Sequence, residues 1–106
     1  MSDILDLVRQ AAKSKLLFLP HAVNQMSRLD RMISRSEVKD VIMKGEMIED
    51  YPEDPRGHSC LLLGLGEEGE GIHVVCAPKK DYLAVITAYL PTHKEWEGNF
   101  KERRRQ

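Results

Sequence analysis

The chain has 106 residues, of which 42% are hydrophobic and 31% charged, and its formal net charge is −1. These values are typical of one soluble globular domain, which we expect over residues 1–106, and they exclude a disordered chain. No apolar run is long enough for a membrane span, and the N-terminus has acidic residues instead of a secretory signal's basic ones, so we expect a cytoplasmic protein without a membrane partner.

Helical periodicity dominates the first part of the chain. Apolar residues recur at helical spacing over about 3–15 and again over about 20–31, where Pro20 suits the first helical position. A third helix is predicted over about 35–44. It begins with a capping box formed by Ser34 and Glu37 and ends at Gly45.

After Gly45 the periodicity changes to that of strands. The acidic run 46–51 predicts an edge strand, because charges discourage pairing between sheet edges. Apolar runs predict further strands over about 59–65, 72–77 and 83–90, with Leu62, Val74, Val85 and Ile86 in the core.

A second capping box, formed by Thr92 and Glu95, predicts a C-terminal helix over about 93–104. Short connections between successive strands favour antiparallel pairing. We therefore expect an α+β fold, in which the N-terminal helices and the C-terminal helix cover one face of a four-stranded, mainly antiparallel sheet.

The charge is unevenly distributed along the chain. Residues 46–70 contain eight acids and one base, a net charge of −7, whereas the remainder has 15 bases and 9 acids, a net charge of +6. A polyanion would therefore approach the helices and termini. The overall charge neither requires nor excludes a nucleic-acid partner.

The two cysteines raise the question of a metal site. His58 and Cys60 share one face of a strand, but His73 and Cys76 are three residues apart and point to opposite faces. This spacing disfavours zinc. We expect Cys60 and Cys76 to be buried free thiols, and we expect neither a metal nor another cofactor.

Three polar residues, His73, Thr87 and Tyr89, interrupt the predicted hairpin 71–91. A loop with an odd number of residues would place them on one sheet face, whereas an even loop would separate His73 from the two hydroxyls. The sequence leaves both registers open. It also leaves open whether these residues are hydrogen-bonded core residues or the floor of a site.

Metal-free cleavage of RNA needs a base for the 2′-hydroxyl proton, an acid for the leaving 5′-oxygen, and positive charge near the phosphate. His21 and His73 have the appropriate chemistry for the proton steps. Arg28, Arg31 and the C-terminal arginines could supply the charge. A structural histidine and a solvated arginine tail are the alternative interpretation.

The segments PHAVNQM, RMIS, MIEDYPEDPRGHSCLLLG and IHVVCAPK, followed by DYLAVITAYLP and EW, occur in this order between about Pro20 and Arg105. Together they resemble the bacterial domain of unknown function family 4258. That family is grouped with the RelE-like, barnase-like and colicin-type RNases and often lies beside a small zinc-finger antitoxin. The resemblance implies a RelE-like fold and a toxin role. By position, it places the family's polar pattern on His21, Arg31, His73, Thr87 and Tyr89.

The chain departs from the family pattern in one element. Many members have Arg where this chain has Gln25, and the segment SRLDRM is about one helical turn longer than the commonest form. If the usual arginine contacts phosphate, Arg28 or Arg31 must replace it here. RNase toxins are also typically basic, and this chain is not.

From the residues and the resemblance, we expect a toxin-like, metal-independent endoribonuclease of a bacterial toxin–antitoxin pair. Its partners would be an RNA substrate and a small antitoxin of the zinc-finger or DNA-binding type. The alternative is a non-catalytic RelE-like module that binds a protein partner or RNA. The expected catalytic residues are His73, His21, Tyr89 and Thr87, and the expected RNA phosphate contacts are Arg31, Arg28 and Arg103.

Overall fold

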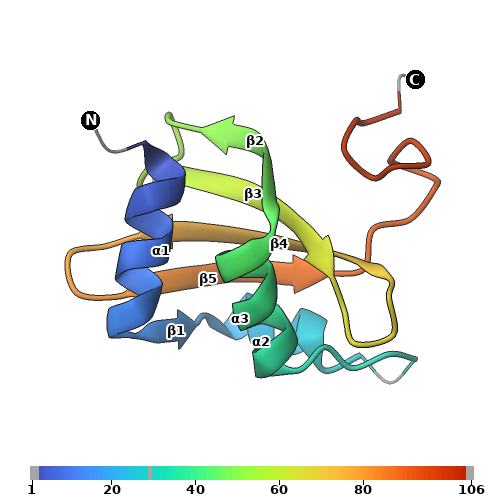
Figure 1. Ribbon diagram of the computed structural model, residues 1–106, viewed down its shortest axis with the longest axis horizontal. Helices are drawn as coiled ribbons and strands as arrows, with labels where there is room; N and C mark the ends of the chain where they lie inside the picture. Colours follow the sequence, from blue (N-terminus) through green and yellow to red (C-terminus); the bar gives the residue numbers. More distant parts are fainter. Residues whose placement is uncertain (1–2, 29, 105–106) are drawn as a thin grey trace.

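The computed structural model describes residues 3–28 and 30–104, and within them the chain forms three helices and five strands in an α+β arrangement (Figure 1). No helix in this part of the chain is long and apolar enough to cross a membrane. The helices are α1 (Ile4–Ser14), α2 (Pro20–Met26) and α3 (Arg35–Lys44). The strands are β1 (Leu16–Phe18), β2 (Glu46–Tyr51), β3 (Ser59–Leu65), β4 (Gly71–Pro78) and β5 (Leu83–Tyr89).

The strands form one mixed sheet in the order β1-β5-β4-β3-β2. The four predicted strands are present and pair as an antiparallel meander. The predicted number of strands was wrong, because β1 adds a fifth strand that runs parallel to β5 at one edge. β1 spans only three residues, which is too short for a periodic sequence signal. It is held by backbone hydrogen bonds, including Leu19 N to Val85 O at 3.0 Å.

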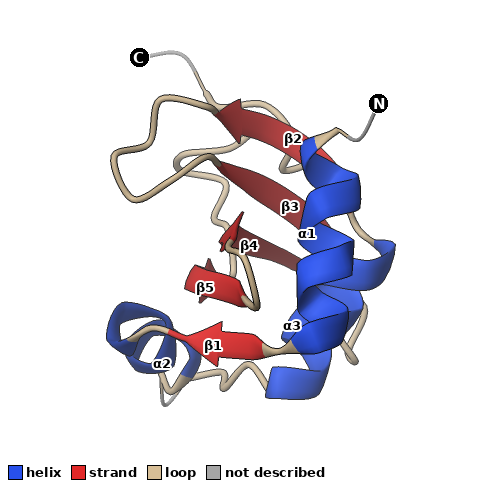
Figure 2. Ribbon diagram, turned by 90° about the vertical axis from the view of Figure 1, so that its left-hand side faces the viewer, coloured by secondary structure: helices blue, strands red, loops and turns tan. Residues whose placement is uncertain are grey.

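The α1 and α3 helices cover one face of the sheet, and α2 lies at the end of the sheet beside β1 (Figure 2). α2 ends at Met26, earlier than the predicted residue 31, and Leu29 lies outside the described residues. The Ser27 hydroxyl donates a hydrogen bond of 2.7 Å to the Val23 carbonyl, so a side chain satisfies the end of the helix.

The predicted C-terminal helix 93–104 is absent, and this prediction was wrong. Residues 91–104, called the strap below, form turns and a single bridge between Trp96 and Arg103. Thr92 O does accept from Trp96 N at 3.1 Å, but this turn does not continue into a helix. The backbone at Phe100 has φ 60°, which no α-helix tolerates. The local capping pattern is overridden by the burial of Trp96, which is only 2% exposed.

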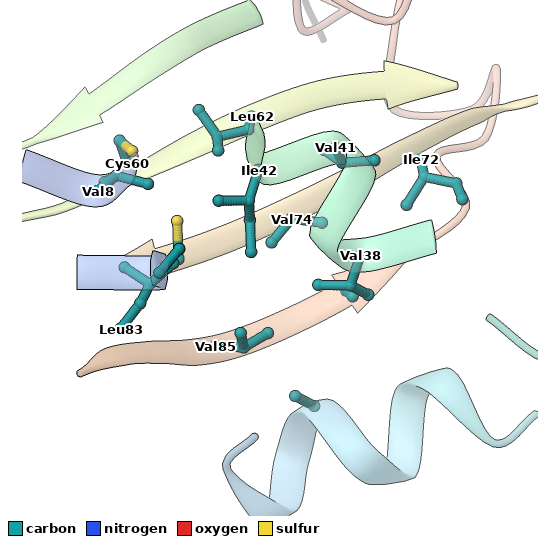
Figure 3. Close-up of a cluster of buried hydrophobic side chains, with 14 of the residues drawn as sticks. Val8, Val38, Val41, Ile42, Cys60, Leu62, Ile72, Val74, Leu83 and Val85 are labelled. Atoms are coloured by element: carbon teal, nitrogen blue, oxygen red, sulfur yellow. The ribbon is translucent and has the colours of Figure 1, made fainter. Parts of the chain in front are cut away.

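The hydrophobic core lies between the sheet and the pair α1 and α3 (Figure 3). The four residues predicted for the core are all buried, which confirms that prediction. Gly64 of β3 allows α3 to approach closely, since a Cβ there would lie 3.0 Å from the Val41 Cα. The buried residues of the helices and strands include Val8, Val38, Val41, Ile42, Leu62, Ile72, Val74, Leu83 and Val85.

Candidate functional site

A hollow of about 590 Å³ opens between α2, the segment that follows it, and the end of β5. Of the residues predicted for the site, His21, Arg28, Arg31, Thr87 and Tyr89 line this hollow. They come from segments that are far apart in the sequence, so the fold brings most of the predicted site together. Other lining residues include Gln25, Asp30 and Glu95.

A β-bulge places Thr87 and Tyr89 on the same sheet face as His73. The pairing of β4 with β5 shifts by one residue between Val75 and Cys76, so His73 lies directly opposite Tyr89. The loop 79–82 has an even number of residues, which was expected to separate His73 from both hydroxyls. That expectation was wrong, because it assumed an unbroken register, and a bulge reverses the parity.

His73 lies behind Tyr89 and outside the lining of the hollow. Its side chain is fully buried, with edge contacts to Tyr89 and Trp96 at ring-centroid distances of 5.3 and 4.4 Å. Nε2 is 2.8 Å from the Phe100 carbonyl oxygen, and Nδ1 is 3.2 Å from the Tyr89 hydroxyl. With the strap in place, the imidazole therefore holds neighbouring groups in position and has no access to a ligand.

The hydrogen bonds fix the tautomer of His73. A carbonyl oxygen can only accept, so Nε2 carries the hydrogen and donates to Phe100. Nδ1 then accepts from the Tyr89 hydroxyl. Burial lowers the pKa of His73 and raises the pKa of Tyr89. The pair is thus a neutral imidazole and a protonated phenol at neutral pH.

Arg103 fastens the strap to the sheet and does not line the hollow. Its guanidinium lies 4.6 Å from the centre of the Trp96 ring, and its Nε is 3.0 Å from Oε2 of Glu49 on β2. The hydrogen bond with Glu49 raises the pKa of Arg103. A phosphate contact by Arg103 would compete with this ion pair.

Arg31 lines the hollow, but three carboxylates surround its charge. Its Nη2 lies 2.6 Å from Glu37 and 2.9 Å from Glu70, and its Nε lies 3.4 Å from Glu68. The hydrogen bonds to Glu37 and Glu70 raise the pKa of Arg31. Its net electrostatic attraction for a phosphate is therefore small, and the contacts instead join the α2–α3 segment to the β3–β4 turn.

His21 and Arg28 are the more accessible basic side chains of the hollow. His21 is exposed in the first turn of α2. The Arg28 side chain is 64% exposed, and its nearest carboxylate is Asp30 at 3.6 Å. An exposed pair of this kind is held weakly, so Arg28 is available to an anionic ligand.

Thr87 contributes an unsatisfied hydroxyl to the hollow. Its Oγ1 is buried and has no hydrogen-bond partner in the described part of the chain. Leaving a buried hydroxyl unpaired costs on the order of 1–3 kcal/mol. A ligand in the hollow would remove this cost by pairing with Thr87.

Cys60 and Cys76 are buried free thiols, as predicted. They lie opposite each other on β3 and β4 and face the core. No group of three or more potential metal-ligating residues occurs within residues 3–28 and 30–104.

Residue types alone did not predict two features around the hollow. The first is the strap, although Gly98 within the predicted helix was a signal against a helix. The second is Glu37, which the capping box identified only as a helix start. Glu37 also binds Arg31 and the backbone N–H of Glu67, 2.8 Å from its Oε2. Sequence spacing carries no signal for these long-range contacts.

The family described as "Domain of unknown function (DUF4258)" matches residues 18–90, which include α2, α3 and the whole antiparallel meander but only the last residue of β1. No curated protein and no solved structure matches the chain. The strap lies beyond the matched residues. Since the match covers more than half of the sequence, the chain belongs to the domain of unknown function family 4258.

Proposed function

We propose that this protein is a RelE-like, toxin-type endoribonuclease of the cytoplasm that cleaves RNA without a metal and is held inactive by a small antitoxin. The observation that carries the proposal is the convergence of His21, Arg28, Thr87 and Tyr89 on one hollow. These residues supply an imidazole, an exposed positive charge and two hydroxyls. Together they match what cleavage by an RNA 2′-hydroxyl requires.

In this reaction His21 takes the proton of the 2′-hydroxyl, and the 2′-oxygen attacks phosphorus. The bond to the 5′-oxygen breaks, that oxygen takes a proton from solvent water, and protonated His21 returns its proton to solvent, which gives a 2′,3′-cyclic phosphate and a 5′-hydroxyl end. Arg28 stabilises the charge that develops on the phosphate oxygens. His73 was expected to be a catalytic base or acid, but its buried position assigns the proton step to His21 in this proposal.

A non-catalytic RelE-like module that binds RNA or a protein partner is the second candidate. Two observations favour it: the carboxylates already compensate Arg31, and Phe100 and Tyr89 already occupy both nitrogens of His73. Such a protein would use the hollow for binding alone. It would bind RNA, or an antitoxin, and leave the RNA intact.

Induced expression in bacteria, followed by incubation of the purified protein with RNA, separates the two candidates. Wild type is expected to arrest growth and to produce cyclic-phosphate ends, and His21→Ala is expected to do neither. His58→Ala is the matched control, since His58 is also exposed but pairs with Asp50 outside the hollow. Full activity of His21→Ala would refute the catalytic assignment. RNA binding without cleavage by wild type would favour the second candidate.

A further inference from the structure

The hydrogen-bond chain from the strap to the hollow has a fixed direction. It begins at the Phe100 carbonyl, which accepts from Nε2 of His73 at 2.8 Å. Nδ1 is left with a lone pair, so the Tyr89 hydroxyl must donate to it. The only hydrogen on the Tyr89 oxygen is then directed toward His73, and the oxygen's remaining lone pair is available to a ligand.

The surroundings of His73 keep this direction fixed. Trp96 and Tyr89 pack against the imidazole, which has no exposed surface. The charged groups near it are Glu49 on β2 and Arg103 on the strap, and these are bonded to each other. Glu49 raises and Arg103 lowers the pKa of the imidazole, and burial, which has the largest effect, lowers it and keeps the ring neutral.

A ligand group that meets Tyr89 must therefore be a hydrogen-bond donor. A phosphate oxygen, which only accepts, does not fit at this point. Thr87 lies on the same strand face, and its unpaired hydroxyl can donate or accept. The floor of the hollow thus favours a neutral group with a hydrogen to give, beside the cationic side that Arg28 provides.

We propose that Tyr89 accepts a hydrogen bond from the 2′-hydroxyl of a ribose next to the one whose 2′-oxygen attacks, and that the hollow thereby selects RNA over DNA. This inference rests on the proposed function and adds the feature by which the substrate is recognised. A 2′-hydroxyl is the sugar group that distinguishes RNA from DNA, and it is a neutral donor. His73 is a positioning residue in this arrangement, because it acts only through the hydroxyl of Tyr89.

The test uses fluorescently labelled hexauridylates that carry a 2′-hydroxyl, a 2′-amino or a 2′-fluoro group. The hydroxyl and amino groups donate hydrogen bonds, whereas fluorine cannot. The amino and fluoro oligomers also resist cleavage by a 2′-oxygen, so their binding can be measured at equilibrium. Wild type is expected to bind the amino oligomer about three- to tenfold more tightly than the fluoro oligomer, which is the effect of one net hydrogen bond.

Three variants identify the residues responsible. Tyr89→Phe is expected to bind all the oligomers equally, because it lacks the acceptor. His73→Phe is expected to lose most of the discrimination, since the Tyr89 hydrogen is no longer held. His73→Gln is expected to retain it, because the amide nitrogen can donate to Phe100 while its oxygen accepts from Tyr89. A general loss of structure would weaken the binding of every oligomer and leave the ratio of their affinities unchanged. Thermal melts check that each variant folds.

The outcomes separate this inference from the proposed function. Wild type that binds the amino and fluoro oligomers equally would overturn the role of Tyr89 and leave RNA cleavage standing. Discrimination that survives in Tyr89→Phe would do the same. If wild type binds none of the oligomers and cleaves no RNA, the proposed function fails, and the inference fails with it.

Discussion

Replacing Glu37 by glutamine is expected to destabilise the fold at neutral pH although it preserves the side chain's shape. Glu37 is 3% exposed and accepts from Ser34 N at 2.9 Å, Glu67 N at 2.8 Å and the Arg31 guanidinium at 2.6 Å. These donors all favour the charged carboxylate. The hydrogen bond from Arg31 is the main cause that lowers the pKa of Glu37 from 4.5 to about 2.

The magnitude of the effect follows from linkage between protonation and folding. A pKa lowered from 4.5 to about 2 corresponds to roughly 3 kcal/mol of stability at neutral pH. Glutamine keeps one acceptor but places an N–H₂ group among donors, so we expect a loss of about 2–3 kcal/mol. Because the folded-state pKa is the lower one, wild type loses this contribution as the pH falls from about 4.5 toward 2.

Urea unfolding of wild type and Glu37→Gln, measured from pH 7 to pH 3, tests this reasoning. The difference in unfolding free energy should be largest at pH 7 and should shrink below pH 4.5. Glu53→Gln is the matched control, because Glu53 is exposed, and it should unfold like wild type. A Glu37→Gln protein within about 0.5 kcal/mol of wild type at pH 7 would refute the argument, since ordinary surface substitutions have effects of that size.

Three further predictions concern the core and the strap. Val74→Ala should lower the unfolding free energy by about 2–4 kcal/mol in urea melts, because Val74 is fully buried, and a loss below about 1 kcal/mol would contradict its place in the core. Gly64→Ala should lower the melting temperature, since its Cβ would press on the Val41 backbone, and an unchanged melt would show that α3 can shift. Burial lowers the pKa of His73 below its usual 6.5, so the unfolded state binds a proton that the folded state does not. Wild type should therefore lose unfolding free energy as the pH falls below 6.5, whereas His73→Gln should not lose this contribution. Equal pH dependence of the two proteins would contradict a buried neutral imidazole.

Local sequence signals predicted the elements whose boundaries are locally determined. The bounds of α3 follow from the capping box at Ser34 and Glu37, and both of its hydrogen bonds are present. The strands after Gly45 follow from the change of the hydrophobic pattern from helical to strand periodicity, and no tertiary contact overrides this local preference. In these segments the local preference and the packing agree, so the sequence was sufficient.

The sequence was insufficient where a tertiary contact decides the outcome. The pattern at Thr92 and Glu95 is a valid helix start, but Trp96 gains more by packing on His73 than by continuing a helix. Likewise, Arg31 has the composition of a phosphate contact, and only the fold shows that Glu37 and other carboxylates compensate it. The candidate site residues were therefore predicted as a group, but their individual environments were not.

The position of the hydroxyls in the hollow depends finally on one extra residue in β5. With an unbroken register from the Pro78–Leu83 pair, Thr87 would lie opposite Val74 and point into the apolar core beneath α3. The bulge at Ile86 keeps Val85 in the core and turns Thr87 outward. The bulged register therefore buries the hydrophobic Val85 before the bulge and directs the hydroxyls of Thr87 and Tyr89 after it away from the core. The burial pattern that stabilises the sheet is also what presents Thr87 to the hollow and places Tyr89 opposite His73.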